Sequence, residues 1–250
     1  MSRRYPTKDI KLLWGLSAGR CAFPDCRQPS IIDGTEVDDR AIIGKIAHIY
    51  AHSNEGPRAK PDLTDEERDR YDNWVILCSR HHDLVDAQPN TFTAEDLLSW
   101  KRDLETWVSS QLATEIAEIT FVELEIVTQA LLQSPMPPSS DFTVISPHEK
   151  MARNDLTDSV LFMVTLGIGK SKEVEDFVEH VAVRDPSFPE RLRAGFVNEY
   201  NRLRDEGYVG DSLFEALRQF ASNGNSNFAR QAAGLAVLIY LFEKCEVFEK

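Results

Sequence analysis

The sequence predicts an α+β protein with a small mixed domain over residues 1–110 and an all-α domain over residues 141–250. Two observations predict this division. Short apolar and β-branched segments alternate with helical patterns only in the first part, which also contains three of the four cysteines. The second part contains only helical patterns, separated by Gly, Pro and Asn. Residues 111–140 end in the Pro/Ser-rich segment 134–140, and we interpret them as a connecting helix and linker.

The first elements follow from apolar spacing and breaker residues. Residues 8–18 have the pattern of a helix that stops at Gly19. Residues 40–50 are rich in β-branched residues and predict a strand. Residues 53–70 are polar, and Thr64 followed by an acidic run predicts a short capped helix.

The next elements complete the predicted domain and lead into the second part. Residues 74–77 predict a second short strand, and residues 80–87 and 94–108 predict helices. A long helix is expected over residues 113–133. Further helices are expected over 151–167, 172–183, 187–206, 211–222 and 226–247. We assign the four tryptophans to the core rather than to base stacking: Trp14, Trp74, Trp100 and Trp107.

The charge is distributed unevenly along the chain. The net charge is −13, which argues against a protein that coats nucleic acid non-specifically. Residues 1–110 carry 15 Lys+Arg and 19 Asp+Glu, a net of −4, which leaves −9 for residues 111–250. We therefore expect any DNA to bind the first part. No apolar run reaches the ~20 residues of a membrane span, and the N-terminus lacks a signal-peptide core, so we expect a cytoplasmic protein without membrane attachment.

Four residues have the spacing of zinc ligands. Cys21 and Cys26 form one close pair, and Cys78 and His81 form another. Thiolates and imidazoles bind zinc, and two such pairs can close a tetrahedron around one ion. The alternative is two chance cysteines with a buried Cys78. We favour one structural Zn²⁺ that ties the start of the first domain to its end.

Three further residues suggest a second site. His82 follows His81, and neighbours in a helix point about 100° apart, so both cannot serve one closed site. His48 lies in an apolar strand and, taken alone, would be a core histidine with satisfied nitrogens. Taken together with Asn73, Cys78 and His82, it suggests a catalytic group.

These motifs resemble a known family. The chain resembles the HNH (ββα-metal) endonucleases of bacterial anti-phage defence, of the subgroup with Ala-His-Ile, in the segments GRCAFPDCRQP, IGKIAHIYAHSNEGPRA, LTDEERDRYDNWVILCSRHHDLVD and LLSWKRDLE within residues 8–108. The resemblance implies that His48 is the general base and that Asn73 pins the loop between strand and helix. It implies that His82 ligates a catalytic Mg²⁺ or Mn²⁺, and that the Cys/His pairs form a zinc knuckle.

The sequence departs from the family at the metal site. Many members have a metal-ligating residue directly before the base, where this chain has Ala47, and relatives in the subgroup often have an acidic residue in place of Lys45. The second protein ligand stays open between Asp39, His52 and Asp83. His52 is also a candidate for substrate contact, or a surface histidine.

Arg58, in a Gly-Pro-Arg turn, is a second candidate for substrate binding. A guanidinium suits phosphate geometry, and the alternative is an arginine that stabilises the turn.

The second part carries no cluster of metal-ligating residues in its sequence. Residues 167–171, GIGKS, lack the spacing of a phosphate loop and predict a helix–helix turn. The end of the chain is similar to C-terminal regions of effectors in three-component ABC-ATPase defence systems, which implies an ABC-type ATPase partner. Oligomerisation of the chain through residues 141–250 is the other possibility, and Cys245 is most simply a small core residue.

The sequence thus predicts a metal-dependent DNA endonuclease, regulated as an effector of anti-phage defence. One alternative is a non-catalytic zinc-binding module that binds a partner or nucleic acid. Another is a sensor or scaffold whose second domain binds a small-molecule signal.

Overall fold

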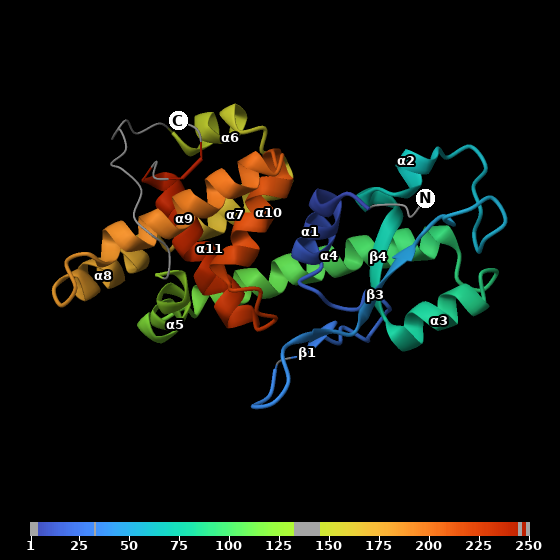
Figure 1. Cartoon of the computed structure of the whole chain (residues 1–250), viewed down its shortest axis with the longest axis horizontal. Helices are drawn as coiled ribbons and strands as arrows, with labels where there is room; N and C mark the ends of the chain where they lie inside the picture. Colours follow the sequence, from blue (N-terminus) through green and yellow to red (C-terminus); the bar gives the residue numbers. More distant parts are fainter. Residues whose placement is uncertain (1–4, 33, 133–145, 245–246, 249–250) are drawn as a thin grey trace. The chain divides into compact units, whose positions relative to one another are not determined.

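The computed structural model describes residues 5–32, 34–132, 146–244 and 247–248. The chain is α+β, as predicted, and divides into two compact units, Met1–Val108 and Ser109–Lys250 (Figure 1). The division falls within one helix, α4 (Ala94–Ala117). The predicted linker 134–140 and Cys245 lie outside the described residues.

The first unit contains the described strands and the helices that surround them. In chain order its elements are α1 (Thr7–Leu16), β1 (Ile31–Ile32), β2 (Ala41–Ile42), β3 (Gly44–His48), α2 (Asp65–Arg68), the 3₁₀ turn η1 (Tyr71–Asn73), β4 (Trp74–Cys78), α3 (Ser79–Ala87) and the start of α4. The short helix α2 begins at the predicted cap, where Thr64 and Glu67 form a reciprocal capping box.

The antiparallel pair of β3 and β4 is the centre of this unit. His48 lies opposite Trp74 at the loop end of the pair. Directly opposite residues share a face, and Trp74 packs with Ile46 against α1 on that face. Lys45 belongs to the other face, where its Nζ lies 2.8 Å from Oδ1 of Asp83 in α3. The pair is therefore covered by α1 on one face and α3 on the other (Figure 1).

The strand expected over residues 40–50 is broken at Ile43. The amide of Ile43 donates to the carbonyl of Ser30, which separates β2, paired with β1, from β3, paired with β4. At Gly44 a Cβ atom would lie 2.3 Å from the side chain of Ser30. A glycine is required where the chain crosses this closely.

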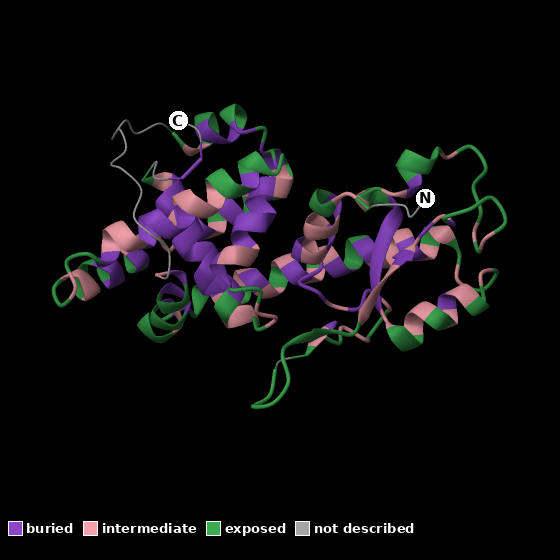
Figure 2. Cartoon of the chain, in the orientation of Figure 1, coloured by how far each residue is buried: buried purple, intermediate pink, exposed green. Residues whose placement is uncertain are grey.

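The second unit is helical throughout its described residues. Its elements are the end of α4, α5 (Phe121–Leu131), α6 (Pro147–Arg153), α7 (Asp158–Ile168), α8 (Ser171–Ala182), α9 (Phe188–Asp205), α10 (Gly210–Ala221) and α11 (Phe228–Glu243). Helix α11 is buried along most of its length (Figure 2) and packs against α5, α7, α8 and α10. Because α5 packs on α11, it belongs to this unit rather than to a separate connecting segment.

Two helix predictions in this part were wrong. The helix expected over 113–133 is interrupted, since α4 ends at Ala117 and α5 begins at Phe121 after a capping box formed by Thr120 and Glu123. The helix expected over 151–167 is two helices, because Asp155 adopts a left-handed backbone (φ 53°) and Thr157 caps α7. In both cases a threonine offers its side chain to the backbone and starts a new helix.

The predicted turn at 167–171 is confirmed, because α7 ends at Ile168 and α8 begins at Ser171. Among the described residues, no helix combines the length and the apolar character that crossing a bilayer requires.

Candidate functional site

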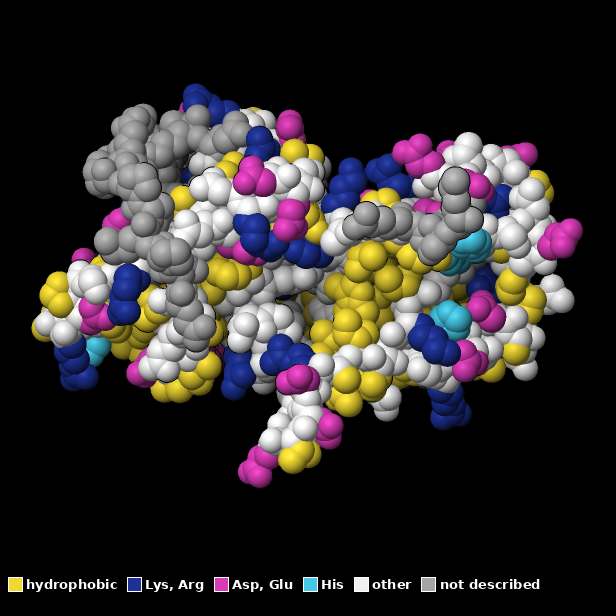
Figure 3. All heavy atoms as spheres, in the orientation of Figure 1, with side chains coloured by type: hydrophobic (Ala, Val, Ile, Leu, Met, Phe, Trp, Pro, Cys, Tyr) yellow, Lys and Arg dark blue, Asp and Glu magenta, His cyan; other side chains and the backbone are white. Residues whose placement is uncertain are grey.

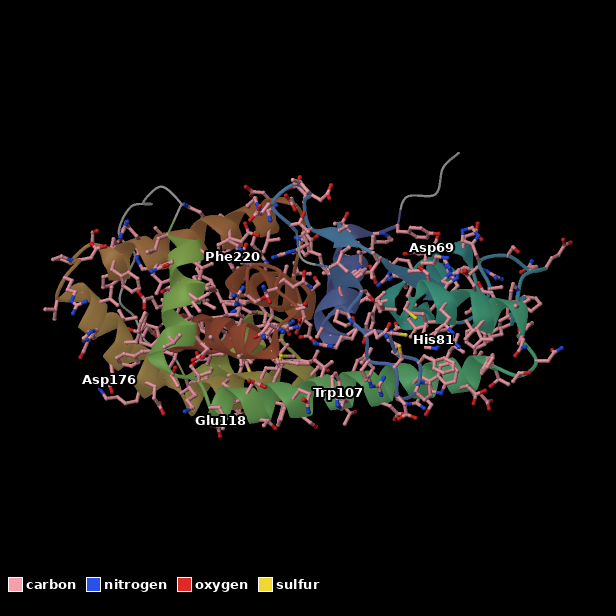
Figure 4. All side chains as sticks on the ribbon, turned by 90° about the horizontal axis from the view of Figure 1, so that it is seen from below. Asp69, His81, Trp107, Glu118, Asp176 and Phe220 are labelled. Atoms are coloured by element: carbon pink, nitrogen blue, oxygen red, sulfur yellow. The ribbon has the colours of Figure 1, made fainter. Side chains whose placement is uncertain are left out.

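The predicted zinc ligands come together in the first unit. Cys21 and Cys26 lie in the loop after α1, Cys78 ends β4, and His81 lies in the first turn of α3. Their ligand atoms all lie within 4.8 Å of one another, a group that could hold a metal ion. Nδ1 of His81 is 3.2 Å from Sγ of Cys78 and 3.5 Å from Sγ of Cys21. Figure 4 shows sulfur atoms beside the labelled His81.

Backbone contacts and ring stacking position this Cys/His cluster. The amide of Ala22 donates to the carbonyl of Ile76 (2.8 Å), which fixes the cysteine loop against β4. The ring of Phe23 stacks on His81 with a centroid distance of 3.9 Å and an interplanar angle of 8°. Phe23 also packs edge-on against Trp100 of α4. Residues from three parts of the sequence thus enclose the cluster.

The electrostatics of the cluster suit a cation. Burial, together with the nearby thiols of Cys78 and Cys26, raises the pKa of the Cys21 thiol to about 12. Burial lowers the pKa of His81, and the nearby Arg80 acts in the same direction, so the neutral imidazole is favoured. Neutral imidazole is the metal-binding form, and a bound dication stabilises crowded thiolates.

His48 lies at the end of β3 among aromatic rings. Its ring centroid is 5.2 Å from that of His52, 5.9 Å from that of Tyr5 and 6.2 Å from that of Trp74. Its Nε2 lies 3.5 Å from Oδ1 of Asp69, and the His48 side chain is 17% exposed. Figure 3 shows histidine side chains at the surface of the first unit beside both basic and acidic groups.

Asn73 fixes the backbone just after His48. Its side chain accepts a hydrogen bond from the amide of Tyr50 (2.8 Å) and donates to the carbonyls of Tyr50 (2.9 Å) and Arg68 (3.1 Å). Its own carbonyl accepts from the amide of Ile49 (2.8 Å). Asn73 is buried, 5% exposed. This geometry agrees with the role of loop pinning that the resemblance implies.

Arg58 is turned inward, and its guanidinium contacts the protein itself. Its guanidinium donates to the carbonyls of Ile49, Val85 and His48, and pairs with Asp86 (2.7 Å). Its side chain is only 4% exposed. These contacts favour the alternative interpretation, an arginine that stabilises the fold, and they join the loop after β3 to α3.

His82 lies in α3 next to two carboxylates. Its Nδ1 is 3.4 Å from Oδ1 of Asp83 and 3.8 Å from Oδ2 of Asp86. Both carboxylates already have cationic partners, because Asp83 contacts Lys45 and Asp86 contacts Arg58. Within the described residues, the Cys/His cluster is the one group of three or more donors close enough for a metal. His82 therefore does not belong to a preassembled three-ligand site.

The other candidates for the second metal ligand lie apart. Asp39 is exposed in the loop between β1 and β2. His52 contacts the ring of His48 and lines a 370 Å³ pocket together with Asn54, Asp65 and Arg68. This position keeps His52 as a candidate for substrate contact.

Two adjacent charged residues were not predicted from the sequence, and one of them, Asp69, contacts His48. Arg68 is buried, 2% exposed, and Asp69 is next to it. Both lie in the run DEERDR, which has the composition of a solvated helix surface, so nothing in the sequence pattern distinguishes them from exposed charges.

The predicted tryptophan positions differ in burial. Trp74 is buried as expected, whereas Trp107 is half-buried, with the guanidinium groups of Arg20 and Arg27 over its ring.

No protein-family model matches this chain, and no curated protein matches it either. The resemblance to HNH endonucleases therefore stays a prediction, and any function must be argued from the geometry of the site.

Proposed function

We propose that the first unit is an HNH-type endonuclease that hydrolyses phosphodiester bonds in DNA. The observation that carries the proposal is His48, which lies at the end of β3 with its flanking backbone held by two buried side chains, those of Arg58 and Asn73. A histidine in a fixed backbone is suited to proton transfer, and the ring of its neighbour His52 lines a pocket. The order strand, loop, strand and helix agrees with the ββα arrangement that the resemblance implies.

We propose that the Cys/His cluster holds one Zn²⁺. Three sulfurs and one nitrogen within 4.8 Å fit a closed tetrahedral site. A closed site has no position for water, so its contribution is to join the cysteine loop to the junction of β4 and α3. The small core of the first unit gives metal binding a direct place in the folding free energy.

The chemistry requires one proton acceptor and one source of positive charge. His48 takes a proton from water as the water oxygen attacks phosphorus, and the bond from phosphorus to the leaving oxygen breaks. The leaving oxygen takes up a proton from solvent. A bound Mg²⁺ or Mn²⁺ supplies Lewis-acid stabilisation of the phosphate.

The donors near His82 fit such an ion in part. His82 offers one nitrogen as a ligand. Asp83 offers an exposed carboxylate, which would give up its ion pair with Lys45 in order to bind the metal ion. Mg²⁺ takes most of its remaining ligands from water and substrate phosphate, so a site with few protein donors is compatible with it.

Plasmid nicking by the full chain tests this function. We expect cleavage with Mg²⁺ or Mn²⁺, loss of cleavage with EDTA, and a loss of about 10²–10⁴-fold in His48→Ala. His148→Ala, in α6 of the second unit, is the matched control and should cleave like the wild type. Equal rates in His48→Ala and the control would mean that His48 is not the base.

The second candidate is a non-catalytic zinc-binding module. Two observations favour it: Ala47 offers no ligand beside His48, and Lys45 pairs with the carboxylate nearest His82. This candidate predicts a zinc-loaded, folded protein that leaves plasmid DNA intact at every Mg²⁺ or Mn²⁺ concentration.

The cellular role and the partner of this unit are inferred from the resemblance alone. We propose a cytoplasmic effector of anti-phage defence whose second unit binds a protein partner, such as an ABC-type ATPase, or a second copy of the chain. Affinity measurements between the purified chain and such an ATPase would test the partner.

A further inference from the structure

We propose that Asp69 is the positioning residue of His48: its carboxylate fixes which ring nitrogen carries the hydrogen, and so which nitrogen is left to accept a proton. The catalytic consequence rests on the proposed function, whereas the contact itself does not. Oδ1 of Asp69 lies 3.5 Å from Nε2 of His48. The two side chains are only 13% and 17% exposed, so solvent competes weakly for this contact.

The chemistry of the two groups fixes the direction of the effect. An ionised carboxylate can only accept hydrogen bonds. At 3.5 Å the contact lies outside hydrogen-bond geometry, so it acts through charge: the negative carboxylate favours the neutral tautomer that carries its hydrogen on Nε2, the nitrogen that faces Asp69. A general base accepts a proton at the nitrogen that carries the lone pair, and in this tautomer that atom is Nδ1 of His48.

The fold holds Asp69 in place through its neighbour Arg68. The Arg68 guanidinium donates to the carbonyls of Leu63 (3.1 Å), Ala51 (2.6 Å) and Lys60 (2.8 Å), and to Oδ1 of Asn54 (2.6 Å). These bonds organise the loop after β3 around the end of α2. The amide of Asp69 donates to the carbonyls of Asp65 and Glu66 at this helix end.

The ring of His48 is restricted from its other sides. Tyr5, His52 and Trp74 contact it at centroid distances of 5.9, 5.2 and 6.2 Å. The carbonyl of His48 accepts from Arg58 (3.3 Å), which fixes the main chain at this residue. A ring confined by packing, with a carboxylate at one nitrogen, is the arrangement in which a buried acid selects a tautomer.

The experiment measures the tautomer and the kinetics in the same full-length variants. The chain is labelled with ¹⁵N-histidine, and long-range ¹H–¹⁵N spectra at pH 8 identify the nitrogen of His48 that carries hydrogen. His48→Gln assigns the signal. The test variants are Asp69→Ala, which removes the acceptor, and Asp69→Asn, which keeps the shape but can offer hydrogens. Glu66→Ala is the matched control, because this carboxylate lies in α2, the helix that Asp69 follows, with its side chain 85% exposed.

We expect the wild type to have hydrogen on Nε2, and both Asp69 variants to gain the Nδ1-protonated form. We expect kcat for DNA cleavage to fall about 10- to 100-fold, less than on removing the base, with KM within about twofold. Glu66→Ala should change neither readout. Circular dichroism and thermal melting identify any variant that has lost its fold. If Asp69→Ala does not fold, the test is made with Asp69→Asn alone.

An unchanged His48 tautomer in both folded variants overturns the proposal, even if cleavage slows, because the loss would then come from the loop. Absence of cleavage by the wild type would instead overturn the proposed function. In that case the spectra alone decide the coupling between Asp69 and His48.

Discussion

His81 and His82 are neighbours in α3 with different surroundings. His81 stacks on Phe23 and contacts the sulfurs of two cysteines. His82 instead lies between the carboxylates of Asp83 and Asp86. Helical geometry alone predicts that adjacent side chains diverge, so the sequence was sufficient to expect that they would not share one closed site.

The orientation of the Arg58 side chain could not be predicted from the sequence. A Gly-Pro-Arg turn contains no information on which way the guanidinium points, and only the packed fold reveals its three backbone acceptors. The same holds for Arg68 and Asp69. Their burial depends on contacts with residues 51–63, which a local sequence pattern does not contain.

The Cys/His cluster gives the first prediction. The purified chain should contain about one equivalent of zinc after extensive dialysis, as measured by elemental analysis. Cys78→Ser should lose this zinc and unfold the first unit, because the remaining donors cannot close the site. Cys245→Ser, which changes the cysteine outside the cluster, is the control and should keep the metal. Wild-type protein that is metal-free and still folded would contradict the structural role.

The two adjacent histidines give the second prediction. His82→Ala should remain folded with its zinc, and should lose cleavage at low Mn²⁺ with partial recovery at high Mn²⁺, because one ligand of a weak site is missing. His81→Ala should instead lose zinc and melt at a lower temperature. Manganese titrations of nicking, with melting curves for both variants, check this difference. Identical behaviour of the two variants would refute the separation of roles.

At the scale of elements, local signals predicted the parts that local chemistry determines. The capping box at Thr64 marks the start of α2, and runs of β-branched and apolar residues mark β3 and β4. The break between α4 and α5 was missed because residues 113–133 are good helix formers on both sides of it. The short pair of β1 and β2 was missed because a two-residue strand carries too little pattern.

The loop after β3 gives a prediction at this scale. Arg68→Ala removes a buried guanidinium with four hydrogen-bonding partners and should lower the free energy of unfolding by about 3 kcal/mol or more. Arg102→Ala is the control, because this residue is exposed and substitutions at exposed positions change the free energy of unfolding by about 0.5 kcal/mol at most. Urea unfolding followed by tryptophan fluorescence measures both. Equal losses would mean that Arg68 does not organise the loop.

The packing of α11 gives the corresponding prediction for the second unit. At Gly234 a Cβ atom would lie 2.7 Å from the backbone of Ala221, so α10 and α11 must separate to accept it. Gly234→Ala should therefore destabilise the second unit by about 1–3 kcal/mol without loss of zinc. Gly169→Ala, whose nearest contact would be 3.3 Å, should have a smaller effect. Calorimetry with parallel zinc analysis separates the effects, and an unchanged melting profile in Gly234→Ala would contradict the close packing.

At the scale of the whole molecule, the acidic second unit gives a hypothesis about control. Residues 111–250 carry a net charge of −9, taken as 13 Lys+Arg against 22 Asp+Glu. Net negative charge slows the association of a protein with DNA, and salt screens this effect over about 8–10 Å. We therefore expect the intact chain to be weakly active until a partner binds residues 141–250.

A truncated chain of residues 1–117 tests this brake. It keeps all of α4, but Leu112 and Ile116, buried in the full chain, become exposed and are replaced by glutamine to keep it in solution. We expect it to nick DNA at least as fast as the full chain, with the difference shrinking as salt increases. A folded, zinc-loaded truncation that does not cut would show that the second unit is needed for activity, and the brake hypothesis would be abandoned.

The central claim is that His48 drives attack of water on a DNA phosphate. Cleavage of a defined duplex in H₂¹⁸O, followed by mass spectrometry of the products, tests it most directly. We predict one ¹⁸O atom in the terminal phosphate for each broken bond with the wild-type chain and Mg²⁺ or Mn²⁺, and a yield of labelled product that is about 10²–10⁴-fold lower with His48→Ala. Intact DNA with the zinc-loaded wild type, or an equal yield of labelled product with His48→Ala, would contradict the account.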